Sequence, residues 1–146
     1  GAGTGYTVNL ALPAGSGPET YADAFRRVIL PVLARFDADL VLVSAGFDAH
    51  RRDPLANMLL DEASYQAMTS ALVDHVEARG HGRLGCVLEG GYDLQALEGS
   101  VAAVVRAMRG ERVALPEDAA PSPGRAAVDA TVRALDPVWR LSESHA

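Results

Sequence analysis

The sequence contains almost no cysteine, and this absence limits the chemistry that it can hold. Cys86 is the only cysteine among 146 residues, so no disulfide can form within the chain. A metal site built from several cysteines is excluded for the same reason. Any metal ligand supplied by this chain is therefore expected to be His, Asp or Glu.

Long apolar runs and an excess of positive charge are also absent. No apolar run approaches the roughly 18 residues that a membrane helix needs. The N-terminus lacks the charged region followed by an apolar region that marks a secreted protein. The net charge is -6, and no basic cluster indicates nucleic-acid binding. These absences predict a cytoplasmic protein with no direct contact to membranes or nucleic acid.

The residues that are present are typical of a soluble globular domain. Hydrophobic residues make up 49% of the chain and charged residues 22%, which argues against disorder. A length of 146 residues suffices for one domain but not for two. The chain begins at Gly1 without a methionine and opens on a glycine-rich stretch, which indicates a piece of a longer protein.

Hydrophobic spacing predicts alternating strands and helices. Strands are predicted over 6–12, 39–45 and 83–88, and helices over 18–36, 61–79, 94–108 and, more weakly, 125–135. Pro31 is expected to kink the first helix near its end. The apolar runs of the second and third strands indicate strands that are buried in a sheet, the second on both faces. The order predicts an α/β protein with parallel strands and right-handed crossovers.

Two loops at the ends of these strands carry the candidate functional residues. The first loop follows Ala45 and contains Asp48, and the second follows Leu88 and contains Tyr92. The carboxyl ends of parallel strands meet at one edge of a sheet, which is where ligands bind in such folds. Asp48 and Tyr92 are therefore expected to lie at the same edge, where they can share one site.

The two loops also carry the motifs of a known family. Two segments resemble paired motifs of the histone deacetylase and acetylpolyamine amidohydrolase family, as found in its bacterial and class II members. They are S-A-G-F-D-A-H-R-R-D-P-L (44–55) and L-E-G-G-Y-D-L (88–94). The opening G-Y-T-V-N-L-A-L (5–12) is similar to a strand of that family. The resemblance covers roughly residues 3–110. It implies the C-terminal part of an arginase/deacetylase-like three-layer α/β fold with a parallel sheet.

The resemblance implies a role for individual residues. Asp48 matches an aspartate ligand of the family's catalytic zinc ion, Zn²⁺. Tyr92 matches the tyrosine whose hydroxyl donates a hydrogen bond to the substrate carbonyl and then to the tetrahedral oxyanion. Substrate-binding positions are Phe47, Leu55, Gly90 and Gly91, and Tyr6 matches a tyrosine beside a structural monovalent cation, K⁺.

The implied reaction is hydrolysis of an acetyl or related acyl amide on a lysine side chain or a polyamine. A catalytic zinc needs three protein ligands. The resemblance implies that the other two, in a D-x-H motif, precede this chain, as does the tandem histidine pair that acts as general base and acid. The chain alone is therefore expected to be inactive. Homo-oligomerisation is left open.

The implied domain organisation has three parts. Residues 1–110 form the C-terminal part of a deacetylase catalytic domain, 111–124 a linker rich in Pro, Ala and acidic residues, and 125–146 a helical tail. An alternative is a non-catalytic binding or assembly module derived from the same fold.

Simpler interpretations exist for single residues. Without the resemblance, Asp48 is expected to be a turn former or a helix cap, and Tyr92 a packing aromatic at a helix start. His50 is predicted to be a rim or loop histidine, although D-A-H suggests a second metal pair, and Asp53 before Pro54 is predicted to be a structural turn residue. The spacing around Gly90 fails the G-x-G-x-x-G pattern of a dinucleotide site.

Overall fold

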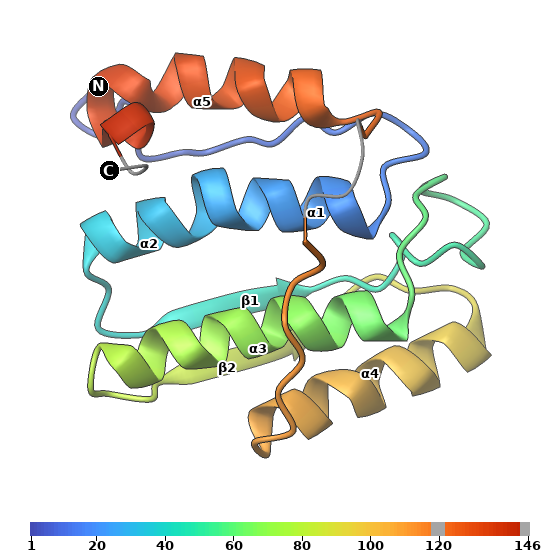
Figure 1. Ribbon diagram of the computed structural model, residues 1–146. Helices are drawn as coiled ribbons and strands as arrows, with labels where there is room; N and C mark the ends of the chain where they lie inside the picture. Colours follow the sequence, from blue (N-terminus) through green and yellow to red (C-terminus); the bar gives the residue numbers. More distant parts are fainter. Residues whose placement is uncertain (118–121, 144–146) are drawn as a thin grey trace.

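A computed structural model describes residues 1–117 and 122–143 (Figure 1). The elements are, in order, α1 (Pro18–Ala24), η1 (Phe25–Ile29), α2 (Leu30–Phe36), β1 (Val41–Ala45), α3 (Glu62–Ala78), β2 (Leu84–Leu88), α4 (Leu94–Met108), α5 (Arg125–Trp139) and η2 (Leu141–Glu143). Strands β1 and β2 pair in parallel, in a register that runs from Val41 with Leu84 to Ala45 with Leu88. Helix α3 joins them, so the predicted βαβ unit is confirmed.

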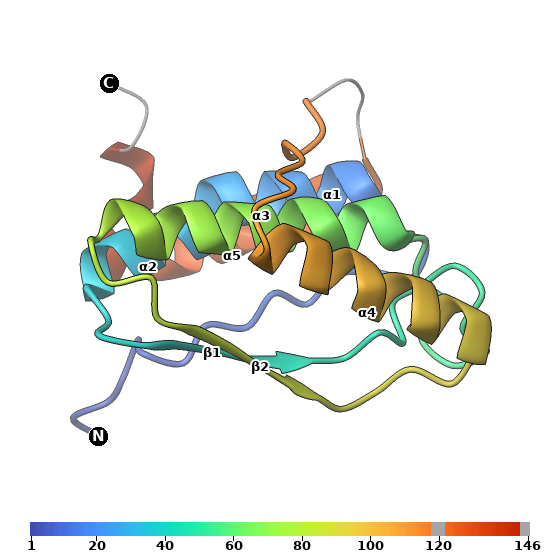
Figure 2. The ribbon, with the colours of Figure 1, turned by 90° about the horizontal axis from the view of Figure 1, so that it is seen from below.

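The helices lie to one side of the two-stranded sheet (Figure 2). Val41 faces the helices and is 9% exposed, whereas Leu42 on the opposite face is 68% exposed. Val87 of β2 lies on the same open face as Leu42 and is also exposed. The prediction of burial on both faces is therefore wrong for β1 within the described part of the chain, because no described element covers the second face.

The first predicted helix is continuous but contains a π-helical turn. In η1 the amide of Leu30 donates to the carbonyl of Phe25, five residues earlier. The next residue, Pro31, has no amide hydrogen and its ring crowds the carbonyl four residues earlier. The kink that was expected at Pro31 takes the form of this widened turn, which lies just before the proline.

The segment 6–12 is not a strand, which corrects the prediction. Val8, Leu10 and Leu12 alternate toward the core as a strand would, but no neighbouring strand pairs with them in the described residues. Extended backbone becomes a strand only when a partner takes up its hydrogen bonds. The segment instead packs its alternate side chains on the cluster formed by α1, η1 and α5.

Helix α5 extends beyond its predicted end and packs onto the helices at the start of the chain. Val128 is fully buried and Trp139 is 5% exposed, both in a cluster with Ala24 and Val28. The indole Nε1–H of Trp139 donates to the carbonyl of Gly5 at 2.7 Å. Part of the predicted linker, 118–121, and the end of the tail, 144–146, lie outside the described residues, so the predicted division of the chain stays a prediction.

Candidate functional site

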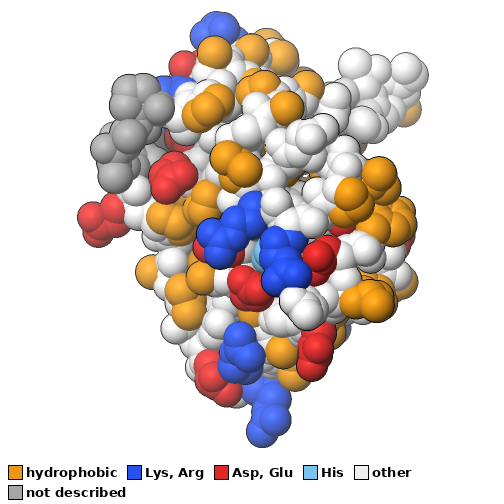
Figure 3. All heavy atoms as spheres, turned by 90° about the vertical axis from the view of Figure 1, so that its right-hand side faces the viewer, with side chains coloured by type: hydrophobic (Ala, Val, Ile, Leu, Met, Phe, Trp, Pro, Cys, Tyr) orange, Lys and Arg blue, Asp and Glu red, His pale blue; other side chains and the backbone are white. Residues whose placement is uncertain are grey.

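The two motif-bearing loops meet at the carboxyl edge of the sheet. The amide of Phe47 donates to the carbonyl of Gly90 at 2.8 Å, and the amide of Glu89 donates to the carbonyl of Ala45 at 3.0 Å. These bonds continue the parallel pairing of β1 and β2 past the last paired residues. Figure 3 looks onto this side of the molecule, where arginine and acidic side chains are interspersed among apolar ones.

Gly90 allows the second loop to contact the carboxylate of Asp48. A Cβ added at Gly90 would lie 3.0 Å from Cγ and 3.1 Å from Oδ2 of Asp48. At Gly91 the backbone has φ +129°, and an added Cβ would lie 3.0 Å from Cβ of Phe47. Glycine is therefore required at both positions, because a side chain there would crowd Asp48 or Phe47. At Gly91 the positive φ is a second reason, since residues with a side chain rarely adopt it.

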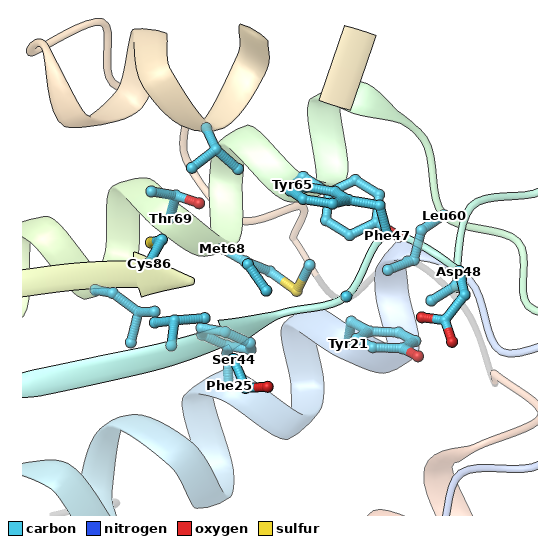
Figure 4. Close-up of a pocket in the computed structure, with 16 residues that line it drawn as sticks. Tyr21, Phe25, Ser44, Phe47, Asp48, Leu60, Tyr65, Met68, Thr69 and Cys86 are labelled. Atoms are coloured by element: carbon cyan, nitrogen blue, oxygen red, sulfur yellow. The ribbon is translucent and has the colours of Figure 1, made fainter. Parts of the chain in front are cut away.

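Asp48 also borders an apolar cavity of about 400 Å³ between the sheet and the helices (Figure 4). Tyr21 lies at the same end of the cavity, and burial together with the negative charge of Asp48 raises the pKa of its hydroxyl. Among the described residues, none donates a hydrogen bond to the carboxylate of Asp48. A half-buried carboxylate without such a donor, next to apolar walls, is available to bind a cation, and the low local dielectric strengthens that attraction.

Tyr92 projects from the second loop just before α4. Its side chain is 61% exposed, and its amide donates to Oδ2 of Asp53 at 2.8 Å. The next residue, Asp93, caps α4 by accepting the amide of Ala96 at 2.8 Å. The phenol is therefore presented to solvent from the start of a capped helix, on the loop that also contacts Asp48.

The predicted substrate-binding residues occupy different environments. Leu55 is 62% exposed, as a wall of an open channel would be, and its amide donates to Oδ1 of Asp53 at 2.9 Å. Phe47 is 4% exposed and packs its ring against Tyr65, with ring centroids 5.0 Å apart. Phe47 borders the cavity from the core side. Substrate contact of either residue stays a prediction.

Tyr6 lies far from the two loops, against the C-terminal helix. Its ring packs edge-on against Trp139 at 5.3 Å and against Phe36 at 6.2 Å. The side chain is 60% exposed. The structure places Tyr6 in an aromatic cluster, and the cation beside it stays a prediction.

His50 lies in the loop between β1 and α3, as one of the two predicted positions has it, but it is buried and not at a rim. Its side chain is 1% exposed, Nδ1 accepts the amide of Arg52 at 3.1 Å, and Nε2 lies 3.6 Å from Oε1 of Glu62. The ring is enclosed because the loop folds back on the start of α3, with a bridge between His50 and Leu60. Nδ1 is thus occupied by a backbone amide, whereas Nε2 is buried beside Glu62 and makes no hydrogen bond to the described residues. His50 and Asp48 are not part of any group of three metal-ligating side chains in the described part of the chain.

One candidate metal ligand, and no complete metal centre, lies in the part of the chain that the structure describes. No group of three His, Cys, Asp or Glu side chains in that part could hold an ion. Asp48 fits one ligand position, since its carboxylate is half-buried and accepts no hydrogen bond from these residues. Burial raises the pKa of the Cys86 thiol, which agrees with its prediction as a small apolar residue of the strand.

The fold and the site together define a parallel α/β protein with candidate catalytic groups on the loops at the carboxyl edge. Comparison with known proteins agrees with the motif resemblance. A family model described as "Histone deacetylase domain" matches residues 1–108. The chain belongs to the histone deacetylase domain family.

Curated relatives show the same family similarity over about three quarters of the chain. It is 43% identical to histone deacetylase 14, chloroplastic, of Arabidopsis thaliana, over 76% of this chain and 26% of that protein. It is 40% identical to a histone deacetylase-like amidohydrolase of Pseudomonas aeruginosa, over 77% of this chain and 30% of that protein. The chain therefore spans less than a third of the length of these relatives.

Solved structures confirm the α/β class and extend the similarity to nearly the whole chain. The structure of the histone deacetylase Clr3 has a TM-score of 0.87 and 36% identity, covering 97% of this chain and 23% of that one. The HDA15 HD domain has a TM-score of 0.86 and 32% identity, covering 97% and 38%. No helix within residues 1–117 and 122–143 combines the length and hydrophobicity needed to cross a bilayer.

Proposed function

We propose that the protein carrying this chain is a zinc-dependent amidohydrolase that removes acetyl or related acyl groups from lysine side chains or polyamines. The observation that carries the proposal is the contact of Gly90 with the carboxylate of Asp48, which brings the tyrosine-bearing loop onto the candidate metal ligand. Family membership and the names of the relatives support the same chemistry.

In this proposal Asp48 and Tyr92 act on the same carbonyl group. Asp48 supplies a negatively charged oxygen ligand to zinc. Bound zinc polarises an amide carbonyl and lowers the pKa of a water molecule to about 7. The hydroxyl of Tyr92 donates a hydrogen bond to the substrate oxygen as negative charge develops on it, which contributes about 3 kcal/mol to transition-state stabilisation. Leu55 forms part of the wall against the acyl-bearing side chain.

The proposal assigns the remaining groups to sequence outside this chain. Two further zinc ligands and a histidine pair for proton transfer are needed, and the described residues do not contain a complete set. We propose that this chain contributes the last ligand and the oxyanion donor, and that it neither binds zinc tightly nor hydrolyses amides alone.

Replacing Tyr92 tests the catalytic assignment. In the complete protein, Tyr92→Phe is expected to retain zinc and folding and to lower kcat by about 10²- to 10³-fold toward an acetyl-lysine peptide or an acetylpolyamine. Tyr65→Phe is the matched control, because the buried hydroxyl of Tyr65 makes no hydrogen bond to the described residues. Unchanged turnover in Tyr92→Phe would refute the role of the phenol.

The same measurements separate this proposal from the non-catalytic alternative. A complete protein that folds cooperatively but binds no zinc and hydrolyses neither substrate would be a binding or assembly module built on the deacetylase fold. Zinc bound at one equivalent, together with turnover of either substrate, excludes that alternative.

A further inference from the structure

We propose that Asp53 is the positioning residue that holds Tyr92 in its catalytic orientation. This inference rests on the proposed function, and it assigns to Asp53 a task beyond the turn that its sequence context indicates. Its carboxylate joins the loop that carries Asp48 to the loop that carries Tyr92, through bonds to backbone amides on both.

The two oxygens of Asp53 have separate partners. Oδ1 accepts the amide of Leu55 at 2.9 Å within its own loop, and Oδ2 accepts the amide of Tyr92 at 2.8 Å, 39 residues further along the chain. Asp53 is 9% exposed, so water competes little for either bond. Bonds from backbone amides to an ionised carboxylate are stronger than those between neutral groups.

Tyr92 has few other constraints on its orientation. Its side chain is 61% exposed, so packing does not fix the ring. The preceding residue, Gly91, has φ +129° and lacks a side chain that would restrict its backbone. The carboxylate of the following residue, Asp93, accepts the amide of Ala96 at the start of α4 and makes no bond to Tyr92. The bond to Asp53 is therefore the contact that sets the backbone from which the phenol projects.

The same carboxylate fixes two groups that face the proposed substrate. It sets the distance between the Leu55 backbone and the Tyr92 backbone, since one side chain accepts from both. A displacement of a catalytic group by about 1 Å can lower a rate by about 100-fold. Loss of the Tyr92 bond is therefore expected to act on kcat more than on substrate binding.

The neighbouring Arg52 provides a matched control. Its guanidinium also spans the two loops, donating to Oε1 of Gln95 at 2.7 Å and lying 3.4 Å from Oδ2 of Asp93. The Arg52 side chain is 50% exposed, so this link is screened by solvent. Arg52→Gln weakens a bridge between the same loops without touching the Tyr92 amide.

The test uses Asp53→Asn in the complete protein. An amide side chain has an acceptor oxygen at only one of the two positions that the carboxylate oxygens occupy, and at the other position its NH₂ group would face an N–H donor. We expect kcat to fall by about 10- to 100-fold with KM changed by less than about 3-fold and zinc content unchanged. Amide hydrogen exchange in the peptide containing Tyr92 is expected to accelerate. Arg52→Gln is expected to change neither kcat nor the amide exchange of the Tyr92 peptide appreciably.

A double-mutant cycle with Tyr92→Phe shows whether Asp53 acts through the phenol. If it does, Asp53→Asn adds little further loss in the Tyr92→Phe background, because the positioned group is already absent. Equal fold-losses in both backgrounds, or unchanged exchange at Tyr92, would overturn the inference. Inactivity of the unmodified protein, or no effect of Tyr92→Phe, would instead count against the proposed function.

A second variant guards against a folding defect. The short hydroxyl of Asp53→Ser can still accept the amide two residues on, as serine does in turns, but it cannot also reach Tyr92. It is expected to keep cooperative unfolding and zinc and to reproduce the loss in kcat. Loss of zinc or of cooperative unfolding in both variants would overturn the inference, since Asp53 would then serve the fold of its loop.

Discussion

Gly90 has no side chain at the point where its loop approaches the carboxylate of Asp48. A Cβ there would lie 3.0 to 3.2 Å from three atoms of the Asp48 carboxylate group. We expect Gly90→Ala to displace that carboxylate and to weaken zinc binding by the complete protein about 10- to 100-fold, as loss of a contact that orients a ligand does. The measurement is zinc retention against a competing chelator.

Gly3→Ala is the control for this substitution, because a Cβ at Gly3 has no atom within 4 Å. It is expected to leave zinc retention unchanged. If Gly90→Ala retains zinc as well as the unmodified protein does, then either the loop that carries Gly90 moves aside without a cost in free energy, or Asp48 is not a ligand. A parallel measurement on Asp48→Asn distinguishes those two cases.

Only some features of the site could be predicted residue by residue. Asp48 and Tyr92 follow strands that were recognisable from their apolar runs, so their placement at one edge followed from parallel pairing. The link from Asp53 to Tyr92 was not predictable, because it joins positions 39 residues apart and leaves no local pattern. The burial of His50 was missed for the same reason, since it depends on the loop folding back to Leu60.

At the scale of elements, one arginine ties the C-terminal helix to the first helical segment. Arg27 in η1 lies 2.6 Å from Oδ1 of Asp129 in α5 and 3.2 Å from Oδ2 of Asp23 in α1. The hydrogen bond from Arg27 holds the pKa of Asp129 below its ordinary value of 3.8. The folded state therefore binds the Asp129 proton less readily than the unfolded chain does.

This depressed pKa predicts a pH-dependent contribution to stability. Well above pH 3.8 the Asp129 carboxylate is ionised in both states, and its contribution is fully present. As the pH falls through the folded-state pKa, the unfolded chain is protonated first and the contribution is lost. Asp129→Asn is thus expected to lower Tm by about 1–3 °C at pH 7, and this difference should shrink progressively as the pH falls below 3.8.

Thermal unfolding of both proteins across this pH range checks the prediction. Asp39→Asn is the control for loss of one negative charge, because the Asp39 carboxylate is fully exposed and lies 3.8 Å from its partner Arg83. It is expected to leave Tm nearly unchanged at every pH. A difference between Asp129→Asn and the unmodified protein that persists at low pH would show that the ion pair is not its cause.

Elements with strong local signals were predicted closely, and elements that depend on partners were not. Helix α4 runs from Leu94 to Met108 as predicted, between the cap at Asp93 and Gly110 with φ +104°. Segment 6–12 has the alternation of a strand but no partner strand in the described residues. The π-helical form of η1 was not predictable either, because spacing of apolar residues does not distinguish a kink from a widened turn.

At the scale of the whole molecule, the sheet has one covered face and one open face. Leu42 and Val87 are 68% and 59% exposed on the open face, although apolar runs of this kind are typical of strands buried on both sides. The chain covers 23% and 38% of the two solved deacetylase chains that it matches. We expect further sequence of the same catalytic domain to cover this face in the complete protein.

Charged substitutions on the open face are therefore expected to have opposite effects in the two contexts. When the 146-residue chain is produced alone, the exposed apolar face should promote self-association, and Leu42→Arg with Val87→Arg should reduce it. Light scattering after size-exclusion chromatography measures this. Val105→Arg, at an exposed position of α4 and not on a sheet strand, controls for added charge and should reduce association less.

In the complete protein the same pair of arginines should be destabilising. If the face is covered there, two charges enter an apolar interior without partners, and the free energy of unfolding should fall by at least about 3 kcal/mol. Denaturant unfolding monitored with zinc retention measures this loss. Stability that is unaffected by the pair would mean that the face stays in contact with water in the complete protein. Leu42 and Val87 would then need no cover from further sequence of the catalytic domain, and the stability of this part of the fold would not depend on that sequence.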